Sequence, residues 1–285
     1  MNRPALIVLS LALVGCHTPP TPPPTKPVSL SSVFRLAKLQ EIDSAIGQAI
    51  AAEKAPGAVV RIESGGAVYE KTFGYKATLP KRSPMTADTI FDAASLTKVI
   101  ATAPAIALLI EQGKLGLDDR IEKWIPGFKK NGKGAVTIRH LLTHTSGLRP
   151  GFSLKPEWSG VASAIGKAKA ESLTEQPDNK FIYSDINFIL LGEIVRLVSG
   201  ERLDLFVSKN IFQPLGMNDT GFLPPLAKRS SIAPTEQVGE VILHGEVHDP
   251  TARRMGGVAL SLIHISEPTR LLSIADSHVS VKKKR

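Results

Sequence analysis

The first third of the chain carries a helical pattern followed by two strand patterns. Apolar residues recur at intervals of three and four over residues 33–52, which predicts an amphipathic helix that ends at Pro56-Gly57. Two short runs of strand-forming residues, 58–62 and 67–73, lie on either side of Ser64-Gly65-Gly66. This arrangement predicts a β-hairpin with a tight turn.

A second helical pattern starts at Ser95 and continues toward residue 109, with Asp92 and Ser95 as candidate N-cap residues. Pro104 lies inside this pattern and lacks the N–H that would bond to the carbonyl of residue 100. We therefore expect a kink about two turns beyond Lys98.

Further helical patterns cover residues 138–143, 185–198 and 203–211. Residues 115–216 are therefore expected to form an all-helical insert between β elements. A helix, a hairpin and a helix, followed by such an insert, indicate an α+β fold.

Ser95 and Lys98 lie three residues apart at the predicted start of the second helix, so the hydroxyl and the amine share one face. Serine attacks efficiently only when a neighbour takes its proton, and lysine can do so only when its pKa is lowered. Ala93-Ala94 and Val99-Ile100 are expected to keep water from Lys98. The pair is a candidate nucleophile and base. A chain of about this length is expected to contain one Ser-x-x-Lys match by chance. This chain contains a second match, Ser280 to Lys283, so the spacing alone does not identify the nucleophile.

Composition narrows the class of protein. A chain of 285 residues with 42% hydrophobic residues can bury one sizeable core or two closely packed subdomains. The formal net charge is +9, but no basic run alternates with aromatic residues. This pattern argues against nucleic-acid binding.

Residues 1–16 have the pattern of a secretory signal, because Arg3 precedes an apolar run, 5–14, that is too short to span a bilayer. The run ends in Leu13-Val14-Gly15-Cys16, which resembles the lipobox of bacterial lipoproteins. Cys16 is the only cysteine, so lipid attachment is favoured over a structural role; the alternative is an ordinary signal with an incidental cysteine. Residues 17–32, which are rich in proline, are predicted to form an extended tether. We expect a protein of the bacterial cell envelope that is anchored through Cys16 and faces the periplasm.

Two motifs in this order resemble the serine β-lactamase and penicillin-binding-protein superfamily: Ser95-x-x-Lys98 at one helix start and Tyr183-Ser184-Asp185 at another. The class C β-lactamase-like branch is the most similar, and residues 86–98, 138–148, 183–193 and 211–220 all resemble it. The resemblance assigns residues 33–259 to one domain. It implies a β-lactamase/transpeptidase-like fold, in which helices flank an antiparallel sheet and a second subdomain is all helical, here without its last strands.

The resemblance also implies a mechanism. Ser95 would attack a carbonyl to form an acyl-enzyme, and Lys98 and Tyr183 would share the proton relay. Asp185 stands where the class C pattern usually has Asn, at a substrate-binding position, and an ionised carboxylate can only accept hydrogen bonds. The expected substrates are a D-alanyl peptide of peptidoglycan, a β-lactam or a small ester, handled by a monomer without a cofactor. A domain that binds penicillin or peptidoglycan without turnover is the non-enzymatic alternative.

Two pairs of histidines offer a rival, metal-dependent site. His140 and His144 are four residues apart, as are His244 and His248, and this spacing can ligate zinc. Neither pair has the glutamate next to its first histidine that metalloproteases use. We therefore favour the serine hydrolase without a metal. Residues 248–257 resemble a loop near the active site of the same branch, but their sequence indicates no chemical role.

The resemblance stops after residue 259. Residues 260–285 resemble the translation of a sequencing adapter with a poly-A tail, so they are excluded from the predicted fold. No Lys-Thr-Gly lies within residues 217–259, although the family carries such a motif, or a His-x-Gly variant, on a strand that supplies an oxyanion-hole donor. We expect the chain as given to have little or no activity.

Overall fold

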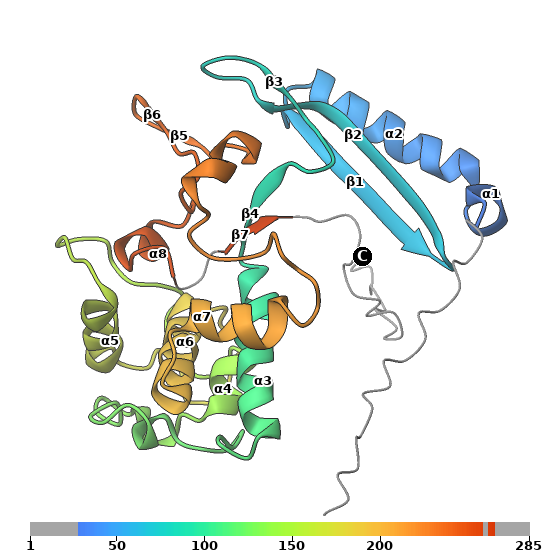
Figure 1. Cartoon of the computed structure of the whole chain (residues 1–285). Coiled ribbons are helices and arrows are strands. Elements are labelled where there is room, and N and C mark those ends of the chain that lie inside the picture. The colour runs from blue at the N-terminus through green and yellow to red at the C-terminus, as the bar shows by residue number, and fades with distance from the viewer. Residues whose placement is uncertain (1–27, 259–261, 266–285) are drawn as a thin grey trace, which may run out of the picture.

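The computed structural model describes residues 28–258 and 262–265 (Figure 1). The predicted signal sequence, most of the predicted tether and the lipidation site Cys16 lie outside these residues, and their assignment stays a prediction. Within the described residues, no helix is both long and apolar enough to cross a lipid bilayer.

The described elements have the mixed composition of an α+β chain. The helices are α1 Leu30–Val33, α2 Leu36–Ala51, α3 Ala103–Glu111, α4 Ile138–Leu142, α5 Val161–Ala170, α6 Asp185–Ser199, α7 Leu203–Val207 and α8 Pro250–Arg254. Shorter π or 3-10 segments are η1 Lys98–Thr102, η2 Ile121–Lys123, η3 Lys133–Ala135, η4 Ser208–Phe212 and η5 Leu226–Ser231. The strands are β1 Gly57–Ser64, β2 Ala67–Ala77, β3 Ser83–Pro84, β4 Ile90–Ala94, β5 Gln237–Val238, β6 Val241–Ile242 and β7 Leu262–Ile265.

The predicted first helix and hairpin are confirmed as α2 and the antiparallel pair β1–β2. The turn between the strands uses Gly65 and Gly66 at φ values of 53° and 79°, a conformation that glycine adopts without a steric penalty. β3 adds a third strand in the order β1-β2-β3, and α2 lies along this sheet (Figure 1). Leu39 is the one buried residue of α2, so little apolar surface is covered in this layer.

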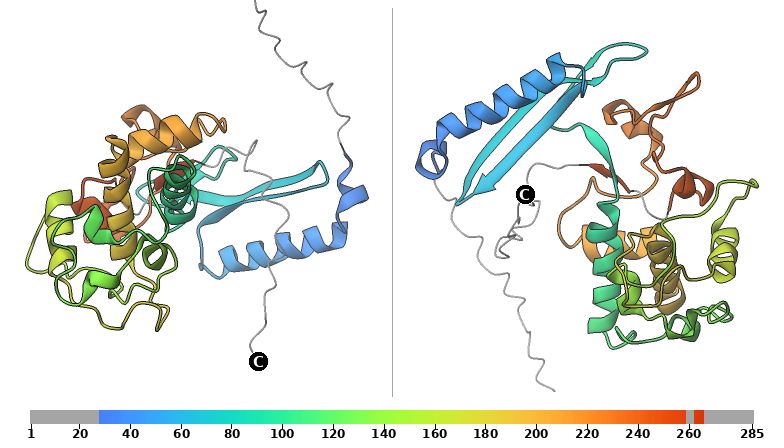
Figure 2. Two further views of the ribbon diagram at one scale, coloured as in Figure 1. Left: turned by 90° about the horizontal axis from the view of Figure 1, so that it is seen from below. Right: turned by 180° about the vertical axis from the view of Figure 1, so that it is seen from behind.

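The hydrophobic core lies among the helices on the other side of the molecule (Figure 2) and contains no residue of α2, β1 or β2. Helix α6 packs against α3, α4, α5, α7 and η1. Residues 186–191 of this helix are all buried, as expected for a helix that neighbours surround on several faces. Gly200 ends the helix in the left-handed conformation, as its sequence predicts.

The all-helical insert is also confirmed. Within residues 115–216, all of which the structure describes, every regular element is a helix, and the isolated bridge from Arg120 to Thr137 is the one strand-like pairing. Helix α5 was not predicted, because its buried positions are the small residues Ala164 and Ala168, which give a weak apolar pattern.

The expected N-caps of the second helix are wrong. Asp92 lies in β4, Ser95 lies in the turn after that strand, and winding begins with the π segment η1. A short apolar run before a turn can form a strand or a helix, and here pairing with β7 decides for a strand. Thr102 and Ala103 have right-handed helical angles, so η1 continues directly into α3, and the irregularity is the π segment before Pro104 and not a kink after it.

Residues 262–265 require a second correction. Their sequence predicts that they lie outside the fold, yet their backbone forms β7, which pairs antiparallel with β4. An unpaired strand edge accepts any extended, strand-forming segment within reach, so pairing does not depend on the origin of the segment. The adapter origin of residues 260–285 stays a prediction.

We expect Gly147→Ala to destabilise the protein strongly. Gly147 has a φ of 77°, and an added Cβ would lie 1.9 Å from the carbonyl oxygen of Glu175. The loss in free energy of unfolding should be at least about 2 kcal/mol, measured by urea denaturation. Gly151 is the matched control, since its Cβ would meet nothing within 4 Å. Its alanine variant should change stability by no more than about 0.5 kcal/mol; equal losses in the two variants would contradict the prediction.

Candidate active site

Ser95 lies exposed on the turn between β4 and η1. Ala94, just before it, has a positive φ of 44°, which is uncommon for a residue with a Cβ and marks a sharp turn. The Asp92 carboxylate accepts the N–H of Ala94 at 2.7 Å and the N–H of His248 at 2.7 Å, so it holds this turn and joins it to a distant loop. Among the described residues the N–H of Ser95 donates to no acceptor, which leaves it available to an incoming oxyanion.

Lys98 is the buried centre of the site. Its side chain is 4% exposed, and its Nζ donates to Ser95 Oγ at 3.2 Å, as the spacing predicts. Val99, one of the residues expected to shield the amine, does not do so, because it is 63% exposed. The aromatic rings of Tyr183 and Phe188 cover the amine instead, with centroids 4.8 and 5.8 Å from Nζ. A cation over an aromatic face is attracted by the ring quadrupole, so these rings both exclude water and favour the charge.

Asp185, predicted to bind substrate, forms an ion pair with Lys98, with Oδ1 2.8 Å from Nζ. It occupies the first turn of α6, where the helix N-terminus favours a carboxylate. An ammonium has three protons and no lone pair, so Lys98 donates to both Ser95 and Asp185 in this arrangement. The sequence places these residues at helix starts but does not reveal the ion pair between them.

Tyr183 joins the site through its ring and not through its hydroxyl. The residue is 43% exposed and lies just before α6, whose N-cap is Ser184. Its hydroxyl makes no hydrogen bond to any described residue, so the predicted relay is assembled in position but is not connected at this atom. Catalytic hydrogen bonds often tighten only when substrate is present.

His144 belongs to the site, although its spacing from His140 indicates only a possible metal ligand. Its ring is buried and contacts Tyr183, with centroids 4.5 Å apart. Burial, and next the charge of Lys98, lower the pKa of His144, while Asp185 opposes this shift. His144 lies within residues 138–148, which resemble the family, and this resemblance was the one feature of the sequence that could have indicated a place in the site.

Asp249 is a further carboxyl group near the site, in the loop to which the sequence assigned no role. Its side chain caps α8 by accepting the N–H of Ala252 at 2.5 Å. Burial raises the pKa of Asp249, and the nearby charge of Asp185 adds to the rise; the Ala252 hydrogen bond and the charges of Lys98 and Arg253 oppose it.

The other three histidines of the two predicted metal-binding pairs have separate partners. His140 Nε2 lies 2.9 Å from Asp178, His244 Nε2 bonds to the carbonyl of Ile232, and His248 pairs with Glu236. Among the residues that the structure describes, no group of three or more His, Cys, Asp or Glu side chains is placed to hold a metal ion. The histidine pairs are thus divided among separate contacts.

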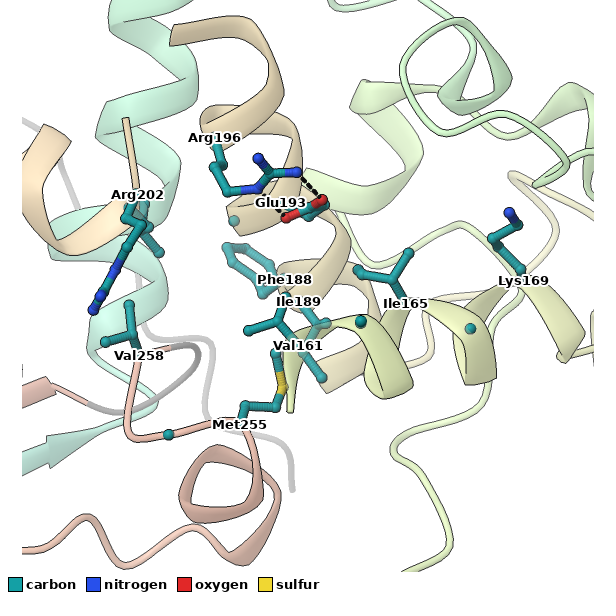
Figure 3. Close-up of a pocket in the computed structure, with 15 residues that line it drawn as sticks. Val161, Ile165, Lys169, Phe188, Ile189, Glu193, Arg196, Arg202, Met255 and Val258 are labelled. Atoms are coloured by element: carbon teal, nitrogen blue, oxygen red, sulfur yellow. Dashed lines mark hydrogen bonds and ion pairs between the residues drawn. The ribbon is translucent and has the colours of Figure 1, made fainter. Parts of the chain in front are cut away.

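A cavity of about 760 Å³ lies beside α6 and next to Val258 (Figure 3). Apolar side chains such as Ile165 and Met255 line it, and a Glu193–Arg196 ion pair lies on its wall. Phe188 is the one lining residue that also contacts the Lys98 amine. The cavity is therefore a neighbour of the candidate site, and neither Ser95 nor Tyr183 lines it.

A family model described as Beta-lactamase matches residues 42–259. The match covers more than half of the chain, so the chain belongs to the beta-lactamase family, within the superfamily of serine β-lactamases and penicillin-binding proteins, and is by family a serine hydrolase. An Escherichia coli K12 protein with the provisional name D-alanyl-D-alanine carboxypeptidase is 32% identical over 295 aligned residues, covering 89% of this chain and 67% of that protein. Penicillin-binding protein 4* of Bacillus subtilis 168 is 36% identical over 173 residues, 58% of this chain and 37% of that protein.

Solved structures agree on the architecture. The octameric penicillin-binding protein homologue from Pyrococcus abyssi has a TM-score of 0.66 and 28% identity, and the match covers 79% of this chain and 53% of that chain. The α+β fold of the β-lactamase/transpeptidase type is thus confirmed. The chain spans about two thirds of the length of the E. coli relative and about half of the P. abyssi homologue.

We expect Asp249→Asn to stabilise the folded protein at pH 7. Because the pKa of Asp249 is raised on folding, ionisation costs stability as the pH rises above the ordinary value of 3.8, and there is no cost below that value. Asparagine removes the charge and keeps the acceptor that caps α8. Urea denaturation should show a more stable variant at pH 7 and a gap that closes toward pH 3.

Asp118→Asn is the control for this titration. The Arg139 guanidinium lowers the pKa of Asp118, so its variant should be slightly less stable at pH 7 and equal to the wild type at low pH. A loss of stability in Asp249→Asn at pH 7 would contradict the assignment.

Proposed function

We propose that Ser95 is the nucleophile of an acyl-transfer hydrolase that acts on an amide or ester. The observation that carries the proposal is the 3.2 Å hydrogen bond from the buried Lys98 amine to Ser95 Oγ, on an exposed turn whose Ser95 N–H has no acceptor among the described residues. Buried charge beside a hydroxyl on a strained turn is unusual in a purely structural serine. Membership of the beta-lactamase family supports the same role.

The geometry suggests how the proton moves. Ser95 Oγ forms a bond to the substrate carbonyl carbon, its proton passes to the Lys98–Tyr183 pair, and the carbonyl oxygen gains negative charge near the Ser95 N–H. The leaving amine or alkoxide takes the proton as its bond to the carbonyl carbon breaks, and water then hydrolyses the acyl-enzyme. Since Lys98 is paired with Asp185 as an ammonium, Tyr183 in its phenolate form is the group able to accept the serine proton.

A peptide ending in D-alanine is the substrate class we favour. Asp185 is engaged with Lys98 and has no N–H to offer, so it cannot donate to the amide carbonyl that a β-lactam and a D-alanyl peptide both carry, and it does not choose between them. The E. coli relative, whose provisional name is a D-alanyl-D-alanine carboxypeptidase, supports the peptide. A small ester is the second substrate class.

Substitutions in the relay should abolish or slow acylation. We expect Ser95→Ala to lose covalent labelling by a fluorescent penicillin or a fluorophosphonate, and Lys98→Ala and Tyr183→Phe each to slow it by at least ~100-fold, as for members of a proton relay. Labelling of the purified full chain, followed over time by in-gel fluorescence, measures the rate. Ser64→Ala, at an exposed strand end, is the control and should label normally. Near-normal labelling of Lys98→Ala would contradict the assigned roles.

Acylation without turnover is the second candidate function. Residues 217–259 contain no Lys-Thr-Gly, and the loss of one oxyanion donor typically slows acyl transfer by ~10²- to 10³-fold. We therefore expect hydrolysis of nitrocefin or a p-nitrophenyl ester to be slower by that factor than in the E. coli relative. Ser95-dependent turnover at an equal rate would refute the deficit, and a label that never leaves would identify a binding protein.

We also propose that the mature chain is attached to the membrane through a lipid on Cys16. The motif that ends in this sole cysteine supports the proposal. Cys16→Ser should move the protein from the membrane fraction to the soluble fraction, because a protein without acyl chains lacks the apolar anchor. An unmodified, wholly soluble wild type would count against it.

A further inference from the structure

His144 holds the backbone on both sides of Tyr183. Its own backbone carbonyl accepts the N–H of Ile182 at 2.8 Å, and its side-chain Nδ1 accepts the N–H of Ser184 at 3.0 Å. The residue between these two donors is Tyr183. His144 therefore holds the backbone of residues 182–184, which places Tyr183 in the site.

The same histidine also contacts the tyrosine ring. The two ring centroids are 4.5 Å apart with planes tilted by 36°, and the Phe188 ring lies 5.2 Å from the imidazole. Tyr183 and Phe188 are the two rings that cover Lys98. Packing of the imidazole against both rings limits where the tyrosine can move relative to the amine.

We propose that His144 is a positioning residue that holds Tyr183 in place against Lys98, through two backbone hydrogen bonds and one ring contact. The catalytic meaning of this inference rests on the proposed function, whereas the structural claim does not.

The hydrogen bonds fix the protonation state of the imidazole. A backbone N–H can only donate, so Nδ1 facing Ser184 must carry a lone pair, and the ring is neutral with its proton on Nε2. Asn187 Nδ2 approaches the same Nδ1 at 3.3 Å, while Asn187 Oδ1 accepts a 2.6 Å bond from Ser146 Oγ, which orients the amide. A proton added to Nδ1 would face both donors and break this buried network.

The surroundings of His144 favour the neutral ring. Burial is the main reason that its pKa is lowered, and the charge of Lys98 on η1 acts in the same direction; Asp185 at the start of α6 acts in the opposite direction. Tyr183, the remaining titratable group in contact with the imidazole, packs against it through its ring. The imidazole therefore stays an acceptor at pH values where an ordinary histidine begins to take up a proton, near 6.5.

The experiment uses the fact that the chain has three tyrosines, of which Tyr69 and Tyr75 lie on β2. In the full chain labelled with [13Cζ]tyrosine, Tyr183→Phe identifies the third resonance. His144→Asn is the informative variant: His144 has a φ of 58°, which asparagine tolerates, and the Asn oxygen can replace the Nδ1 acceptor but not the ring. We expect this variant to shift the Tyr183 resonance while those of Tyr69 and Tyr75 stay in place.

His140→Asn is the matched control, since His140 lies on the same segment but bonds to Asp178 and Thr137. It should leave all three tyrosine resonances unchanged. Ring ¹⁵N spectra of the wild type, which need no variant, should show His144 protonated only at Nε2 and titrating below pH 6.5. A proton on Nδ1 at pH 7, a titration at or above 6.5, or an unmoved Tyr183 resonance in a folded His144→Asn protein would overturn the inference.

Labelling kinetics then separate the two proposals. His144→Asn should lower the maximal acylation rate by about 10-fold, as expected when a relay group is misplaced, without weakening the concentration dependence of labelling. Failure of Ser95-dependent labelling would sink the proposed function alone, because the NMR result still decides whether His144 positions Tyr183. A loss of labelling through weaker reagent binding, at an unchanged maximal rate, would overturn the positioning role.

Discussion

The buried amine of Lys98 is the interaction on which the rest of the site depends. A charged group out of water costs several kcal/mol unless it is paired and hydrogen-bonded. Here Asp185 neutralises it at 2.8 Å, Ser95 accepts its hydrogen bond at 3.2 Å, and two aromatic rings cover it. These partners come from two segments, η1 with its preceding turn and the start of α6. The cluster can therefore form only when these segments are docked against each other.

The scaffold supplies that docking through α6, which the surrounding helices bury on several faces. Fixing this helix fixes the first-turn carboxylate of Asp185 and the tyrosine just before it. Asp92 joins the turn of Ser95 to the loop that carries His248 and Asp249 by accepting a backbone hydrogen bond from each. The sheet of β1, β2 and β3 contributes nothing to this core, so the site depends mainly on the helical half of the chain.

Local sequence patterns predicted most of the elements, because helical periodicity and turn formation depend on residues close together in the chain. Helical periodicity found α2, α4 and α6, and Gly65-Gly66 identified the hairpin turn. The pattern missed α5, whose buried face consists of alanines, and β4, whose pairing partner lies far away in the sequence. Propensity cannot identify a contact between distant segments.

In the candidate site, too, contacts between residues close in the chain were predictable and contacts between distant residues were not. The spacing of Ser95 and Lys98 predicted their hydrogen bond, because both residues lie within one turn of chain. The ion pair of Lys98 with Asp185, the packing of His144 against Tyr183 and the partial burial of Asp249 all depend on contacts that only the tertiary fold makes. Because Val99 follows Lys98 directly in the chain, it was expected to shield the amine from water. It is exposed to solvent instead.

The most direct test of the account is to locate the acyl group after reaction with a penicillin. Tandem mass spectrometry of tryptic peptides should find the adduct within residues 83–98, which contain Ser83 and Ser95, and fragmentation should place it on Ser95. That result would show that the hydroxyl bonded to Lys98 is the nucleophile. An adduct on any other residue, with the Ser95 peptide recovered unmodified, would contradict it.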